Sequence, residues 1–251
     1  SGVSAHNRMV ERHDLPQGGY YWKSYDFAGS FDRQSLRDFP HGPPENAPLA
    51  AGLKSFEHDG GEMIFSLPNG LQGYYLSDAK GNRIDEGPEK IVSYQQRPKD
   101  KAPTIINGRS CLDCHADGIL TKLDMMREHI QTTNTFDFDQ QKFLLKMYIE
   151  QAEMDDLYDR DRNKFVNTLE AMKATEVTSS GTKRSIVAPG NKEIVTWYAD
   201  EYESNLNIDE FAAEFDMEPE EFKSAVRRIS DLRVQQLAMQ KLLQLESGAT
   251  I

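Results

Sequence analysis

The chain has 251 residues, of which 38% are hydrophobic and 10% aromatic, a composition typical of a folded, water-soluble protein rather than a disordered one. Its 41 acidic residues outnumber its 29 basic residues and give a formal net charge of −12. An acidic chain of this kind repels phosphate backbones, so we expect no nucleic-acid partner. No hydrophobic run approaches the roughly 20 residues that a membrane-spanning helix needs, so we expect no transmembrane segment.

The first part of the chain, residues 1–105, is predicted to be rich in strands and loops. Two apolar runs at 62–67 and 72–76 flank the dipeptide Asn69-Gly70. Asn-Gly between apolar runs is a strong signal for a β-hairpin. The run 90–94 predicts a third strand after a further turn. We therefore expect a small antiparallel sheet with long loops.

The remaining part, residues 106–251, has the periodicity of helices. A first helix is predicted from apolar residues at helical spacing, namely Leu120, Leu123, Met126 and Ile130. Asp139 is expected to cap the next helix, and either Asp155 or Asp159 the one after it. Four more helices are expected at 193–202, 208–215, 219–228 and 230–245. The predicted fold class is α+β, in which a strand-rich half precedes a mainly helical half, as two regions or as one integrated domain.

The two cysteines of the chain, Cys111 and Cys114, lie three residues apart, and His115 follows directly. This C-x-x-C-H pattern supplies what covalent haem attachment requires. Two thiols bond the vinyl-derived carbons on one edge of the porphyrin, and the adjacent imidazole reaches the iron. The pattern predicts one haem c, with His115 as the proximal iron ligand.

Three other uses of a cysteine pair fit this sequence less well. A thioredoxin-like redox pair begins a helix that follows a buried strand, whereas the preceding residues 105–109 are few and partly polar. A structural zinc site normally has four ligands, and the chain has no further cysteine. A disulfide across two intervening residues gives His115 no role.

The segment 107–118 resembles the haem attachment sites of c-type cytochromes. The segment 60–76 also resembles a hairpin that uncharacterised bacterial c-type cytochromes place ahead of a single C-x-x-C-H motif. The first resemblance implies thioether bonds at Cys111 and Cys114 and iron ligation by His115, and neither resemblance implies a substrate. The chain departs from small soluble cytochromes c in its length and in the long segment before the motif.

The sequence leaves the second axial position of the iron open among several residues. His129 is our first choice, because it lies on the helix expected to follow the motif. Ordinary packing or surface roles are the alternative for every one of these side chains, and a water-ligated or open position also remains. The candidates are His129, His58, His13, Met125, Met147 and Met154.

A further pattern at 159–170 matches the calcium-loop spacing D-x-D-x-N followed by a Glu at the twelfth place. Lys164 stands at the sixth position, where the loop requires glycine for a sharp turn. We therefore favour an ordinary helix start over a calcium site.

The expected function is extracytoplasmic electron transfer by a monohaem c-type cytochrome. A peroxidase-like haem enzyme with an open distal position and a haem-based sensor or interaction module are the alternatives. The acidic charge predicts a redox partner with a basic docking face. Bacteria form thioether bonds to haem in oxidising compartments, so we expect a periplasmic protein, or one anchored to a membrane through a removed N-terminal segment.

Overall fold

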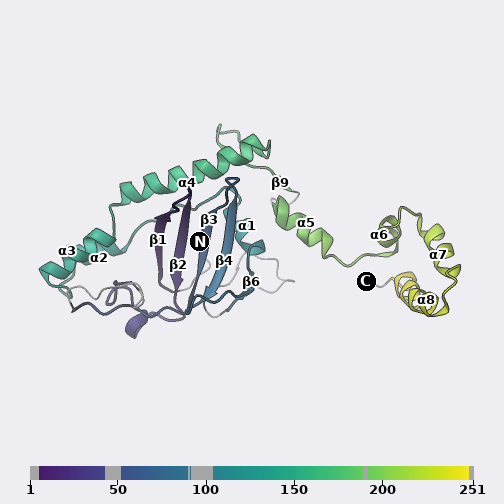
Figure 1. The fold of residues 1–251 in the computed structure, drawn as a ribbon, viewed down its shortest axis with the longest axis horizontal. Coiled ribbons are helices and arrows are strands. Elements are labelled where there is room, and N and C mark those ends of the chain that lie inside the picture. The colour runs from purple at the N-terminus through teal and green to yellow at the C-terminus, as the bar shows by residue number, and fades with distance from the viewer. Residues whose placement is uncertain (1–5, 43–51, 90, 92–103, 189–191, 249–251) are drawn as a thin grey trace. The chain divides into compact units, whose positions relative to one another are not determined.

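The computed structural model describes residues 6–42, 52–89, 91, 104–188 and 192–248. It divides into two compact units, Ser1–Thr196 and Trp197–Ile251. A four-stranded antiparallel sheet precedes most of the helices, which confirms the predicted α+β class (Figure 1). The predicted division at residue 105 separates the sheet from the helices along the chain. The boundary between the two compact units lies further along the chain, after Thr196, because helices that follow residue 105 pack on the sheet.

The elements of each unit follow in chain order. The first unit contains β1 (Arg8–Asp14), β2 (Tyr20–Asp26), a 3-10 turn (Asp32–Gln34), β3 (Gly60–Ser66), β4 (Gln72–Asp78), β5 (Glu86–Gly87), β6 (Ile105–Ile106), α1 (Arg109–His115), α2 (Met126–Thr132), α3 (Phe138–Met147), α4 (Gln151–Ala171), β7 (Thr175–Val177), β8 (Lys183–Ser185), β9 (Val187–Ala188), β10 (Lys192–Glu193) and the start of α5 (Ile194–Tyr202). The second unit contains the rest of α5 and then α6 (Ile208–Ala213), α7 (Pro219–Arg227) and α8 (Leu232–Glu246).

Strands β1 to β4 form a meander in which each strand pairs antiparallel with the next. Strands β3 and β4 are the predicted hairpin, and its turn contains Gly70 at φ 86°, a backbone conformation that favours glycine. The register aligns Trp22, Ile64 and Tyr74 across strands β2, β3 and β4. Because side chains alternate along a strand, these three lie on one face of the sheet. That face carries the candidate site.

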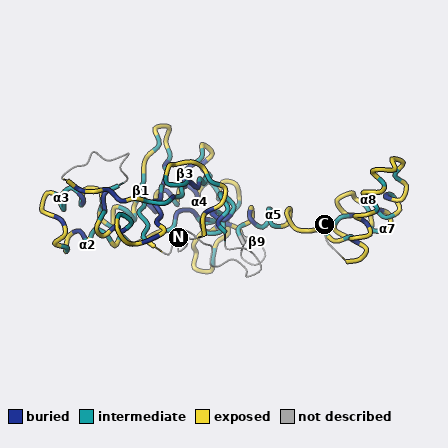
Figure 2. Tube along the Cα trace, turned by 90° about the horizontal axis from the view of Figure 1, so that it is seen from below, coloured by how far each residue is buried: buried dark blue, intermediate teal, exposed yellow. Residues whose placement is uncertain are grey.

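Helix α4 lies along the same face of the sheet (Figure 1). Trp22 of β2 contacts this helix. The indole stacks on Tyr158 of α4 with 4.6 Å between ring centroids. The indole Nε1 donates to Asp161 at 2.8 Å, and Arg12 Nε donates to the same carboxylate at 2.8 Å. One cluster of buried residues, which includes Trp22, Ile64 and Tyr158, lies between the sheet and this helix. Figure 2 shows the buried residues of the chain in dark blue.

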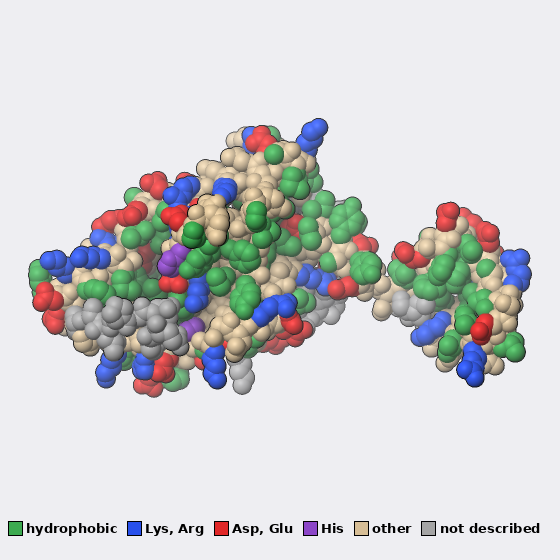
Figure 3. Space-filling model, viewed as in Figure 1, with side chains coloured by type: hydrophobic (Ala, Val, Ile, Leu, Met, Phe, Trp, Pro, Cys, Tyr) green, Lys and Arg blue, Asp and Glu red, His purple; other side chains and the backbone are tan. Residues whose placement is uncertain are grey.

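The second unit has a core of its own, made by Ala212, Phe222, Val226 and Leu242. Helix α7 begins at Pro219, as predicted from the fixed φ of proline at the first helical position. Hydrophobic side chains also remain on the surface of this unit (Figure 3), including Leu232, Leu237 and Leu243 of α8.

Two predicted helix starts were wrong. Helix α2 begins at Met126 rather than at residue 120, because the Asp124 carboxylate accepts hydrogen bonds from the backbone N–H groups of Met126 and Arg127. Helix α3 is capped by Asp137 rather than Asp139. A reciprocal capping box between Asp137 and Gln140 fixes the earlier start.

The predicted cap at Asp155 or Asp159 was also wrong. Both residues lie inside α4, which runs without a break from Gln151 to Ala171. The predicted strand at 90–94 falls almost wholly outside the described residues.

Candidate haem attachment site

Helix α1 carries the complete C-x-x-C-H motif. It follows the short strand β6, and Ser110 joins the two elements because its hydroxyl accepts a hydrogen bond from the Ile106 N–H at 2.9 Å. Residues three and four apart share a face of a helix. Cys111 therefore presents its thiol on the same side as Cys114 and His115.

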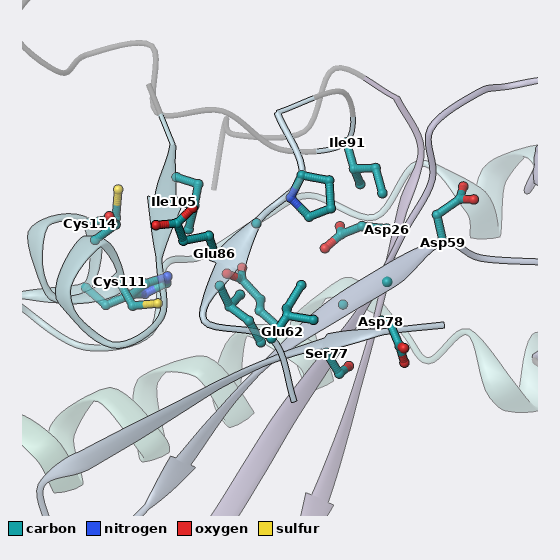
Figure 4. A pocket seen from close by; sticks show the side chains of 18 residues that line it. Asp26, Asp59, Glu62, Ser77, Asp78, Glu86, Ile91, Ile105, Cys111 and Cys114 are labelled. Atoms are coloured by element: carbon teal, nitrogen blue, oxygen red, sulfur yellow. The ribbon is translucent and has the colours of Figure 1, made fainter. Parts of the chain in front are cut away.

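These three side chains line one cavity of about 150 Å³ between α1 and the sheet (Figure 4). Its other walls come from β3, β4 and the segment around β5. A second cavity of about 70 Å³ shares the lining residues Glu62 and His115 with the first. Ligand pockets commonly measure about 300 to 1,000 Å³, so a porphyrin requires the two cavities to join and their rim to open. The apolar lining of the first cavity includes Leu76, Ile84, Ile91 and Ile105.

The imidazole of His115 is held in an orientation that suits iron ligation. The ring is buried, and its Nδ1 lies 3.1 Å from the carbonyl oxygen of Gly118. Gly118 has φ 95°, a left-handed conformation that turns the chain back toward the histidine. A proton on Nδ1 donates to that carbonyl and leaves Nε2 with a lone pair for a metal. Burial lowers the pKa of His115, which keeps the imidazole in the neutral, metal-binding form.

The two thiols differ from those of a redox-active pair. The structure does place a short strand, β6, ahead of the helix, which the sequence argument against a thioredoxin-like site did not foresee. However, burial raises the pKa of Cys111 to about 12, and burial raises the pKa of Cys114 as well. Reactive dithiols have lowered pKa values, because the thiolate is the nucleophile. Both cysteines are free thiols.

A buried charged trio, which we did not predict, lies beside the motif. Arg8 Nη2 donates to Asp26 at 3.0 Å, and Arg8 Nη1 donates to Glu62 at 2.7 Å. Glu62 lines both cavities together with His115. Burial acts to raise the pKa of Glu62, but the charge of Arg8, the hydrogen bond that Arg8 donates and smaller contributions together outweigh burial, so the pKa is lowered. Burial raises the pKa of Asp26 in spite of Arg8.

Local sequence patterns could not predict the trio, because Arg8 and Glu62 are 54 positions apart in the chain. One signal was present: Glu62 occurs two positions before Ile64, on the same face of an otherwise apolar strand.

The structure does not bring the three candidate histidines to the cavities beside His115. The Nε2 of His129 lies 2.9 Å from the carbonyl oxygen of Arg37. His58 packs edge-on against Tyr25, with 4.9 Å between centroids. His13 stacks on Tyr21, on the opposite face of the sheet from Trp22. Among the described residues that line these two cavities, His115 is the only histidine.

The three candidate methionines lie together in another place. Met125, Met147 and Met154 line a third cavity of about 380 Å³, and His115 is not among its described lining residues. This cavity shares Arg8 and several other lining residues with the second cavity.

The calcium pattern at 159–170 does not form a loop. It lies entirely within helix α4, where the Asp161 carboxylate accepts hydrogen bonds from Arg12 and Trp22 instead of binding a metal ion. Over the part of the chain that the structure describes, no cluster of three or more His, Cys, Asp or Glu side chains is arranged to hold a metal ion.

No protein-family model, curated protein or solved structure matches this chain. Among the described helices, none combines the length and the hydrophobicity needed to cross a membrane.

Proposed function

We propose that this chain is a monohaem c-type cytochrome that transfers electrons outside the cytoplasm. The observation that carries the proposal is that Cys111, Cys114 and His115 line one cavity from one helix, while Gly118 orients the imidazole. The two sulfurs would hold the porphyrin through thioether bonds, and His115 Nε2 would bind the iron. A bound haem supplies one-electron exchange between ferrous and ferric iron.

The surrounding residues would exclude water and set the local charge. Apolar side chains such as Leu76 and Ile105 cover much of the cavity wall. The trio of Arg8, Asp26 and Glu62 has one excess negative charge when both carboxylates are ionised. A negative charge beside iron stabilises the more positive ferric state, so this trio is expected to lower the reduction potential.

The partner and the compartment belong to the same proposal. Carboxylates such as Asp59, Asp78 and Glu86 line the first cavity. They support a redox partner with a basic docking face, because opposite charges steer two proteins together. Haem attachment through thioethers supports a periplasmic or other extracytoplasmic location.

The first prediction concerns covalent attachment. The chain should be produced in a bacterium that attaches haem in its periplasm, and compared with the double variant Cys111→Ala, Cys114→Ala. The wild type should retain haem after denaturing electrophoresis and give the pyridine haemochrome spectrum of two thioether bonds. The double variant should lose all haem on denaturation, because no sulfur remains to bond the vinyl-derived carbons.

Asp113→Asn is the matched control, since it changes a position between the cysteines and removes no bonding group. It should retain covalent haem like the wild type. The proposal fails if the wild type carries no covalent haem, or if the double variant holds haem as firmly as the wild type.

A further inference from the structure

We propose that the third cavity binds a small amphiphilic anion, a molecule with an apolar chain and one negatively charged head, such as a medium-chain carboxylate. The cavity measures about 380 Å³, which falls within the range of about 300 to 1,000 Å³ that is common for ligand pockets. Cys111, Cys114 and His115 are not among its described lining residues. The inference therefore concerns a second site and does not depend on the proposed haem.

The apolar part of this lining is rich in methionine. A methionine side chain is unbranched and polarisable, so it fills irregular space and adapts to ligands of different shapes. Such side chains give an apolar chain a favourable surface and can repack around it. Five of the nine methionines of the chain line the cavity, namely Met9, Met125, Met126, Met147 and Met154.

Hydrophobic side chains also remain exposed to water at this cavity. Leu123 is 80% exposed and Met125 is 76% exposed, and both belong to the cavity lining. A single exposed hydrophobic residue is ordinary, but several that adjoin one cavity are typical of a ligand-binding site. A ligand with an apolar chain would remove part of this surface from water.

The charged part of the lining favours an anion. The chain as a whole has a net charge of −12, yet four basic side chains line this cavity and Asp124 is the only carboxylate among its described lining residues. The Asp124 carboxylate already caps α2 by accepting two backbone hydrogen bonds. Arg8 is paired with Asp26 and Glu62.

The other basic residues, His6, Arg37 and Lys122, are exposed. They can hold an anionic head in contact with water while the apolar chain enters among the methionines. Exposed charges screen each other well, so Arg37 and Lys122 are expected to add selectivity, and burial of the chain to supply most of the affinity. A cationic head would be repelled by the same two residues.

The experiment is calorimetric titration of the purified full-length protein with octanoate and with 1-octanol at low salt. The two probes share the same chain length and differ in the charge of the head. We expect octanoate to bind more tightly. The double variant Arg37→Gln, Lys122→Gln should weaken octanoate binding about fivefold, because it removes two exposed charges, and should change 1-octanol binding by less than about twofold.

A second double variant tests the apolar part of the cavity. Met125→Gln, Met147→Gln keeps the side-chain length at two positions where the structure exposes the methionine, and it should weaken octanoate and 1-octanol by a similar factor. With the wild type, affinity should rise by up to about fourfold for each methylene added from hexanoate to octanoate.

The matched control is Lys142→Gln, Lys164→Gln. Both lysines are exposed and neither lines the cavity, so this variant loses the same two charges and should keep the wild-type affinity for both probes. Covalent haem is quantified on every sample. Haem-free protein that binds octanoate would support this inference while the haem proposal fails, and haem-bearing protein that does not bind it would do the reverse.

Three results would overturn the inference. One is the absence of octanoate binding at millimolar concentration. The second is equal binding of octanoate and 1-octanol, with no selective effect of Arg37→Gln, Lys122→Gln, which would show that charge plays no part. The third is octanoate binding that the methionine variant leaves unchanged, which would place the ligand outside this cavity.

Discussion

The thiol of Cys111 illustrates how the fold changes the chemistry of a single residue. Its side chain is only 6% exposed, and burial raises its pKa to about 12. Because the pKa is raised, the thiol stays protonated at neutral pH, and the thiolate fraction grows about tenfold per pH unit until the pKa is reached. A folded chain without haem therefore has an unreactive Cys111.

This residue gives the third prediction. In folded, haem-free protein at neutral pH, Cys111 should be alkylated by iodoacetamide much more slowly than in the chain unfolded in urea. Its rate should rise steeply as the pH rises. Timed quenching followed by peptide mass spectrometry measures both cysteines in one sample. Equal rates for Cys111 in the folded and unfolded chains would contradict the raised pKa.

For individual residues, the sequence predicted only those members of the site that are close together along the chain. Cys111, Cys114 and His115 are neighbours in sequence, and the requirements of haem attachment relate them directly. Glu62 and Arg8 meet only after strand pairing, so no pattern of short range could join them. His129 was chosen because it follows the motif closely, but sequence separation does not fix the direction of a side chain on a helix.

Among the elements, helix α4 depends on one buried carboxylate for its attachment to the sheet. Asp161 accepts hydrogen bonds from Arg12 and Trp22, and both the Asp161 and the Arg12 side chains are almost fully buried. Removing the carboxylate alone would leave the Arg12 guanidinium buried without its main partner. Breaking a buried pair in this way typically costs about 3 to 5 kcal/mol.

The fourth prediction follows from this arrangement. Asp161→Ala should lower the free energy of unfolding of the first unit by about 3 to 5 kcal/mol, measured by urea denaturation. Asp156→Ala, an exposed position on the same helix, should stay within about 0.5 kcal/mol of the wild type. Similar losses in the two variants would show that the contact with Arg12 and Trp22 is not the cause.

Elements were predictable where the signal was local. The β3–β4 hairpin follows from Asn69-Gly70 between apolar runs, and the start of α7 follows from Pro219. Strands β1 and β2 were missed individually, although Pro16 and Gly18-Gly19 between them are turn signals that the sequence already contained. The late start of α2 results from the competing cap at Asp124, which apolar periodicity alone does not reveal.

For the whole molecule, the division into two units means that the second unit must stabilise itself from a small core. Phe222 packs there with Val226 and Leu242. A core of this size rarely provides more than about 3 to 5 kcal/mol, and truncating a buried Phe to Ala commonly costs that much.

The fifth prediction uses the fragment 203–248. The fragment should show a cooperative loss of helical circular dichroism on heating, and Phe222→Ala should abolish that transition. Phe222→Leu, which keeps most of the buried volume, should retain it at a lower midpoint. A fragment that is unfolded even with Phe222 in place would show that this core is insufficient.

The burial of the attachment motif also imposes an order of events during biogenesis. Cys111 and His115 are each 6% exposed, and the walls of their cavity come from β3, β4 and β6 as well as from α1. An enzyme that forms thioether bonds must reach both sulfurs, which the finished fold prevents. We therefore expect the porphyrin to be joined to a chain that has not yet folded, so that the sheet and α1 assemble around it. The hydrophobic core would then form around the cofactor. A chain that folded before haem attachment would have its C-x-x-C-H motif buried and out of reach of the attachment enzyme.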